Sequence, residues 1–185
     1  MGAAIGGLIL ISEDDAQDQL EPEARSAPFE PTPESVVRAT RQALTGKAGD
    51  KTRGIVVRYP AAWSQDKRDG LIILKSPDRC AAVTLSAPGP PEKATAIRKE
   101  ALKALRRSFK RITVRPGSGD PIGGVPTTGR VVDFEDRKGR PVRIILSVGT
   151  GSKYAYLSQT LLRGPSCSSS LLDAQLILST LELSK

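Results

Sequence analysis

Short apolar runs separated by turn residues recur along the chain from about residue 53 to the C-terminus. Runs of this kind, bounded by Gly, Pro, Asp or Ser, are typical of strands. They predict strands over residues 55–59, 71–74, 80–87, 128–135, 142–148 and 153–162. Residues 136–139 predict a hairpin turn between the fourth and fifth of these strands. We therefore expect a mainly antiparallel sheet of about six strands.

Apolar residues three and four apart predict two helices in the same region. Ile97, Ala101, Leu105 and Phe109 form one apolar stripe within residues 92–111. Apolar residues between 171 and 183 predict a second helix that continues to the C-terminus. The opposite face of the first helix carries a row of cations: Arg98, Lys99, Lys103, Arg106, Arg107 and Lys110. We expect an α+β fold in which this central amphipathic helix and the C-terminal helix cover the sheet.

The first 52 residues follow a different pattern. Residues 1–12 are apolar, but a membrane-spanning helix needs about 20 residues. We interpret them as the end of a membrane anchor that begins upstream; the alternative is a disordered start of a soluble protein. Residues 13–52 form an acidic, proline-containing arm and linker, in which residues 33–44 predict a short helix and residues 46–52 a polar linker. Residues 53–185 remain as the folded domain.

Charge is distributed unevenly between these parts. Residues 1–35 hold eight carboxylates and one base, whereas the remaining 150 residues hold 27 Lys or Arg and 12 Asp or Glu. The net charges are therefore −7 and +15. This asymmetry indicates either an anionic partner for the body or an arm that screens it. A solvated basic surface without a partner is the third interpretation.

Candidate chemistry is scarce, since the sequence contains no histidine. Histidine is the commonest general base and metal ligand, and the many serines lack a histidine to activate them. Asp133, Glu135 and Asp136 could hold a cation in the hairpin, but we favour the interpretation that they are solvated turn charges. We predict no catalytic residues, no metal site and no cofactor, and hence a protein that is not an enzyme.

Two cysteines stand at the ends of predicted elements. Cys80 begins the third strand and Cys167 begins the terminal helix. Packing of this helix on the sheet can bring the two within bonding distance, so we predict a disulfide. The alternative is a pair of buried thiols in a reducing compartment. A bridge favours an extracytoplasmic location, and thiols favour the cytoplasm.

Several short motifs resemble the PsbP-like family, an α/β sandwich shared by the extrinsic P protein of photosystem II and a Ran-binding nuclear import factor. They are the Tyr-Pro-Ala-Ala-Trp sequence at 59–63, the Gly-Val-Pro-Thr-Thr-Gly-Arg sequence at 124–130, the Tyr-Ala-Tyr-Leu sequence at 154–157 and the leucine-rich 176–181. The resemblance covers roughly residues 53–185. It implies a PsbP-like sandwich that serves as a binding or assembly module without its own chemistry. The metal-binding histidines of some plant members have no counterpart here.

Three hypotheses of function follow. The first is a non-catalytic extracytoplasmic binding or scaffold module, tethered to a membrane through its N-terminus, whose protein partner is unknown. The second is a cytoplasmic partner-binding adaptor or chaperone. The third is a binder of an anionic surface, such as phosphate or lipid head groups, through the basic residues of helix 92–111. Specific nucleic-acid binding is not expected, because no aromatic residues for base stacking are interleaved with these cations.

Overall fold

The computed structural model describes residues 44–68, 70–120, 122–164 and 167–183. The membrane anchor predicted over residues 1–12 and most of the arm predicted over residues 13–52 lie outside this range. The same is true of the short helix predicted over residues 33–44, apart from its last residue. None of the helices formed by the described residues is both apolar enough and long enough to span a bilayer.

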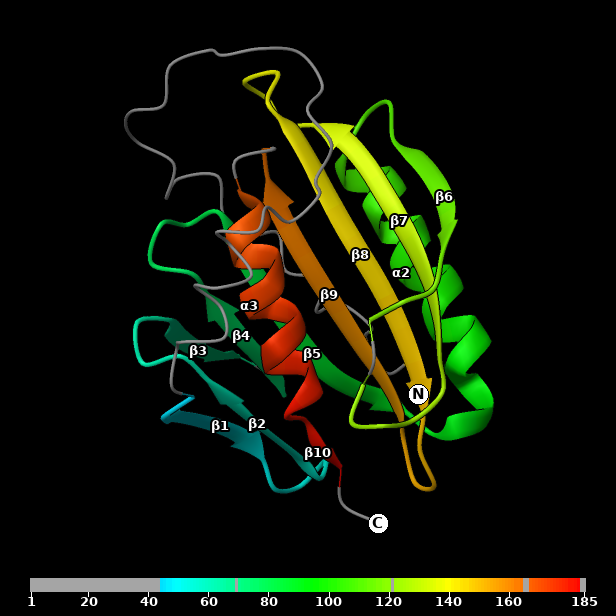
Figure 1. The fold of residues 1–185 in the computed structure, drawn as a ribbon. Coiled ribbons are helices and arrows are strands. Elements are labelled where there is room, and N and C mark those ends of the chain that lie inside the picture. The colour runs from blue at the N-terminus through cyan, green and yellow to red at the C-terminus, as the bar shows by residue number, and fades with distance from the viewer. Residues whose placement is uncertain (1–43, 69, 121, 165–166, 184–185) are drawn as a thin grey trace.

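A seven-stranded antiparallel sheet forms the centre of the molecule, in the order β3-β4-β5-β9-β8-β7-β6. The long strands β7, β8 and β9 lie side by side (Figure 1). The bounds are β3 Ser64–Arg68, β4 Leu71–Lys75, β5 Ala81–Gly89, β6 Thr113–Gly117, β7 Thr127–Glu135, β8 Pro141–Thr150 and β9 Ala155–Arg163. The predicted hairpin turn between β7 and β8 is confirmed by the hydrogen bond from Gly139 N–H to the Asp136 carbonyl, 3.0 Å.

A second sheet of three strands corrects two predictions. It consists of β1 (Gly46–Asp50), β2 (Ile55–Tyr59) and β10 (Glu182–Leu183), in the order β1-β2-β10. The polar linker predicted over residues 46–52 was wrong, because β1 pairs with β2 and buries Ala48 and Asp50. The helix predicted to reach the C-terminus was also wrong, since the chain leaves it after Ser179 and pairs with β2.

The central helix is shorter than predicted. A 3₁₀ turn, η2 (Pro91–Lys93), leads into α2 (Ala94–Ser108). Phe109 already has extended backbone angles, and its ring stacks on that of Phe134 with centroids 4.0 Å apart. This aromatic contact turns the chain towards the sheet and ends the helix three residues before the predicted limit of 111.

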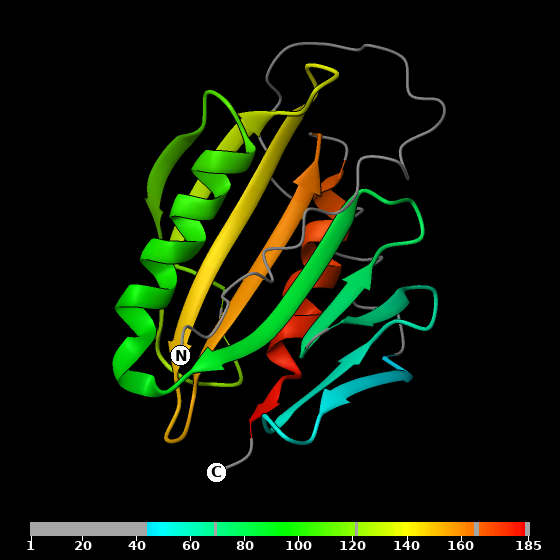
Figure 2. The ribbon, with the colours of Figure 1, turned by 180° about the vertical axis from the view of Figure 1, so that it is seen from behind.

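The elements form three layers. The buried stripe of α2, Ile97, Ala101 and Leu105, packs on one face of the large sheet. The other face is covered by α3 (Ser168–Ser179) together with the small sheet. Figures 1 and 2 show α2 and α3 on opposite sides of the strands. The α+β sandwich implied by the PsbP-like resemblance is therefore confirmed, and each face of the sheet has its own apolar core.

The motif at residues 59–63 forms the corner between the two sheets. Trp63 N–H donates to the Pro60 carbonyl, 2.9 Å, so that the chain turns directly after β2. The Trp63 side chain is buried in the core beneath α3. The motif at residues 59–63, which resembles the PsbP-like family, thus has a structural role: it forms the turn between the small sheet and the large one.

Candidate binding surface

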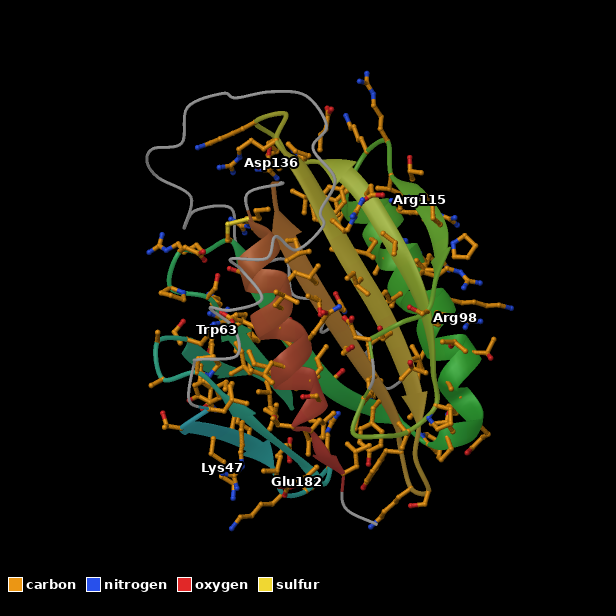
Figure 3. The ribbon with its side chains drawn as sticks, viewed as in Figure 1. Lys47, Trp63, Arg98, Arg115, Asp136 and Glu182 are labelled. Atoms are coloured by element: carbon orange, nitrogen blue, oxygen red, sulfur yellow. A yellow bond between two sulfur atoms is a disulfide. The ribbon has the colours of Figure 1, made fainter. Side chains whose placement is uncertain are left out.

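The cations predicted on the central helix do not all point into solvent. Arg98 is half-buried, and its Nη1 donates to Thr128 Oγ1 on β7 at 2.7 Å. Lys110 is exposed but lies beyond the end of α2. Figure 3 shows Arg98 beside the strands on the α2 side of the molecule. These two residues therefore differ from the other four predicted binding residues.

The remaining four cations form an exposed surface that we name the α2 basic face: Lys99, Lys103, Arg106 and Arg107. Within the part of the chain that the structure describes, no ion pair neutralises any of them. Glu100 is the one carboxylate in the sequence of α2. Among the described residues, this face therefore carries a net positive charge on a helix whose opposite side is buried.

Part of this charge has a structural explanation. Arg106 and Arg107 lie in the last turn of α2, where cations interact favourably with the negative end of the helix dipole. Lys99 and Lys103 lie one to two turns earlier, where this interaction has decayed. The dipole alone therefore does not account for the whole face.

The acidic residues of the β7–β8 hairpin are bound by arginines. Asp133 accepts hydrogen bonds from Arg143 Nε at 2.7 Å and from Arg115 Nη2 at 2.5 Å. Burial acts to raise the pKa of Asp133, but these hydrogen bonds and charges outweigh it and hold the pKa below its usual value. Arg140 pairs with Asp136 at 2.6 Å. Asp133 and Asp136 therefore act as partners of arginines at this hairpin.

The predicted disulfide between Cys80 and Cys167 is confirmed. Their Cα atoms are 5.3 Å apart, and the bridge joins the start of β5 to the start of α3. The carboxylate of Asp78 reinforces the same corner, because it accepts hydrogen bonds from Cys80 N–H at 3.0 Å and from the Ser170 hydroxyl at 3.2 Å. The N-terminal end of α3 is thus attached to the sheet both covalently and through hydrogen bonds.

A buried polar cluster lies on the α3 side of the sheet, and the sequence analysis missed it. Asp120 is only 5% exposed; its N–H donates to Ser147 Oγ at 2.7 Å, and its Oδ2 accepts from Thr160 Oγ1 at 3.1 Å. Gln175 of α3 also hydrogen-bonds to this carboxylate. The buried Ser158 hydroxyl has no hydrogen-bond partner among the described residues. The cluster fixes the loop after β6 to β8, β9 and α3.

Burial dominates the electrostatics of this cluster. It raises the pKa of Asp120 above 3.8, and the hydrogen bonds from Thr160 and Gln175 only partly oppose it. Among the described residues, no group of three or more Asp, Glu, Cys or His side chains could hold a metal ion. Asp120 therefore has a structural role, because its hydrogen bonds join the loop after β6 to β8, β9 and α3.

No protein-family model matches this chain, and no curated protein matches it either. Solved structures do match. A protein of Bacteroides thetaiotaomicron VPI-5482 is similar with a TM-score of 0.53 and 16% identity, over 77% of this chain and 50% of that one. The chain thus spans half the length of that protein. At this identity the similarity is one of fold.

Two further solved structures are similar at lower TM-scores. LpqN of Mycobacterium tuberculosis, which is involved in cell envelope biogenesis, has a TM-score of 0.42 and 14% identity, over 83% of this chain and 98% of that one. The cyanobacterial PsbP (CyanoP) of Synechocystis sp. PCC 6803 has a TM-score of 0.39 and 12% identity, over 75% and 92%. These values leave the function of this chain to be argued from its own residues.

Proposed function

We propose that this chain is a non-catalytic, extracytoplasmic binding module that engages an acidic protein partner through the α2 basic face. The observation that carries the proposal is the exposed charge of Lys99, Lys103, Arg106 and Arg107 on a helix whose opposite side is buried, with no ion pair to any of them from the described residues. A rigid element with a fixed charge pattern steers a complementary partner and fixes its orientation. No aromatic residue stands in α2 to stack on nucleic-acid bases.

The disulfide supports the extracytoplasmic part of the proposal. Disulfides persist in oxidising compartments and are rare in the cytosol, where thiols are kept reduced. The Cys80–Cys167 bridge closes a large part of the domain, over a sequence separation of 87. Because this bridge joins the sheet to the last helix of the domain, it supports folding in an oxidising compartment.

The absence of histidine supports the non-catalytic part. Asp133 and Asp136 are paired with arginines, and Asp120 is buried in a hydrogen-bonded clamp. The carboxylates with shifted pKa values thus already have structural roles, whereas catalytic acids and bases need access to a substrate. These structural roles support a function in binding and not in catalysis.

Charge reversal with a matched control tests the proposal. The variant K103E/R106E/R107E changes the net charge by −6 on α2, and K47E/K51E/R58E makes the same change on β1, β2 and the turn between them. Lys47 lies far from Arg98 of α2 in Figure 3. We expect the α2 variant to elute from heparin, a model polyanion, at clearly lower salt than the wild type. The control should shift much less.

Two results would contradict the proposal. Equal losses of retention in the two variants would show that net charge alone governs binding, without a localised face. Unchanged retention of the α2 variant would show that these cations are a solvated surface. Thermal unfolding of both variants serves as the folding control, since all six substituted side chains are exposed.

A further inference from the structure

Many cations of the domain already have partners, and those without one gather in two places. Arg53 donates to the Ala87 carbonyl at 2.9 Å, and Arg115 pairs with Asp133. The described cations whose side chains make no hydrogen bond, ion pair or ring contact with a described residue are Lys47, Lys51 and Arg58 on and beside the small sheet, and Lys93, Lys99, Lys103, Arg106, Arg107, Lys110 and Arg111 on and beside α2. The larger group includes the whole α2 basic face.

The four cations of the α2 basic face repel one another. Lys103 lies four residues from both Lys99 and Arg107. Arg106 lies three residues from Lys103. Residues at these spacings are neighbours on the surface of a helix, where like charges are destabilising. Glu100, three residues before Lys103, offsets only part of this charge. An acidic segment that lies on the face therefore relieves repulsion within the helix.

The sequence supplies such a segment in residues 13–23. It contains no base, and its six carboxylates are Glu13, Asp14, Asp15, Asp18, Glu21 and Glu23. The described structure begins at residue 44, so at least about 20 residues separate these carboxylates from the domain and span up to about 70 Å. A domain of the size of residues 44–183 has a radius of gyration of about 14 Å and is about 40 Å across. The segment is therefore long enough to reach α2, although Lys47 of β1 lies far from α2 (Figure 3).

We propose that the acidic segment 13–23 occupies the α2 basic face of its own chain and competes there with the acidic partner. This inference rests on the proposed function, because it concerns the regulation of the same face. Tethering makes the contact intramolecular, so it forms at any protein concentration. An external ligand then has to displace the segment, which excludes weakly charged anions and favours a partner of greater complementarity.

The small sheet is the competing location for the segment. Lys47, Lys51 and Arg58 lie close in sequence to the start of the described structure. We favour α2 because its group of cations is the larger one and lies closer in number to the six carboxylates. The exposed Glu182 of β10 further reduces the positive charge of the small sheet.

Paramagnetic broadening in NMR spectra of the ¹⁵N-labelled full-length protein measures the contact. A nitroxide is attached to Gln17→Cys, in the middle of the segment. At low salt we expect selective broadening of the amide signals of residues 99–107. About 0.5 M salt should abolish it, because the Debye length then falls to about 4 Å.

The charge-reversal variants locate the contact when they are combined with the labelled cysteine. K103E/R106E/R107E should remove the broadening of the α2 signals, whereas K47E/K51E/R58E should retain it. Broadening of residues 46–59 that is lost only in K47E/K51E/R58E would place the segment on the small sheet and overturn the inference. Uniform broadening, or none, would also overturn it.

Neutralising the segment tests the competition. D14N/D15N/D18N removes three carboxylates from the segment, and E92Q/E135Q/E182Q is the matched control, because it removes three exposed carboxylates from the domain. A contact formed in about nine tenths of the molecules lowers the apparent affinity of a competing ligand about tenfold. We therefore expect D14N/D15N/D18N to bind a fluorescent polyglutamate peptide up to about tenfold more tightly than the wild type, and the control to change much less. Equal gains in both variants, or no gain in D14N/D15N/D18N, would contradict the competition.

The same measurements separate a failure of this inference from a failure of the proposed function. Polyglutamate binding that does not depend on Lys103, Arg106 and Arg107 would contradict the proposed function and, with it, the competition. Binding that depends on these residues, without broadening of the α2 signals by the label, would overturn the contact with the segment and leave the proposed function intact.

Discussion

Loss of the Cys80–Cys167 bridge should remove a large part of the stability of the domain. The bridge links residues separated by 87 positions. For a closed loop of this length, the chain-entropy model gives a contribution of about 4.6 kcal/mol at 25 °C. Since single domains are stable by about 5–15 kcal/mol, the reduced protein should be marginally stable.

Urea unfolding measures this contribution. The wild type is compared in its oxidised form and after unfolding, reduction and refolding under reductant. With an m-value of about 2 kcal/mol/M, the midpoint should fall by about 2.3 M on reduction. The C80A/C167A variant should be slightly less stable than the reduced wild type, by about 1 kcal/mol, because Cys167 is fully buried and loses its packed sulfur.

Two results would refute this reasoning. A difference below about 1 kcal/mol between the oxidised and reduced wild type would show that the loop is not restricted by the bridge in the unfolded state. Two titratable thiols in unfolded, unreduced protein from an oxidising compartment would show that the bridge does not form. Reductant should leave C80A/C167A unchanged, which controls for other effects of the reagent.

Three further predictions follow from the fold. Burial raises the pKa of Asp120 in the folded state above 3.8. Between the unfolded and the folded pKa of Asp120, the folded protein therefore binds more protons than the unfolded chain, and its free energy of unfolding falls as the pH rises through the folded pKa. Urea titrations at several pH values measure this dependence. It should be absent from Asp120→Asn, and an equal pH dependence in wild type and variant would contradict the assignment. Gly129→Ala places a Cβ atom 2.3 Å from the backbone of Gly119. This substitution should lower the free energy of unfolding by about 1–3 kcal/mol, measured by thermal unfolding, whereas the control Gly89→Ala should leave it almost unchanged. A Gly129→Ala protein as stable as the wild type would show that the two backbones can separate. Deleting residues 1–50 removes β1, so it should lower the melting temperature relative to deletion of residues 1–43, and equal melting temperatures would show that β1 contributes little.

The sequence predicted the strands that have an apolar face and missed those that do not. The runs at 55–59, 71–74 and 142–148 bury alternate or successive apolar side chains and were found nearly at their true limits. The strands β3 and β6 are the two edges of the large sheet and are mostly exposed, so their residues show no apolar alternation. Polar edge strands of this kind protect a sheet from pairing with other chains, and periodicity does not reveal them.

The sequence predicted the cations of α2 but not the contacts that depend on tertiary packing. Helical spacing placed the cations of α2 opposite its buried stripe, and helix packing explains why four of the six are exposed on α2 itself. Arg98 departs from this pattern because Thr128 on β7 is within reach of its guanidinium, a contact between residues distant in sequence. The Asp120 cluster likewise arises from tertiary packing.

The proposed function is tested most directly by site-specific photo-crosslinking in the cells that produce this protein. A photoreactive phenylalanine analogue replaces Lys103 on the α2 basic face in one variant and Lys47 on β1 in another; both side chains are exposed. Crosslinking at Lys103 should yield a discrete adduct with an acidic extracytoplasmic protein, and the Lys47 variant should not. The absence of an adduct at Lys103, or the same adduct at both positions, would contradict the assignment of the α2 basic face as the binding surface.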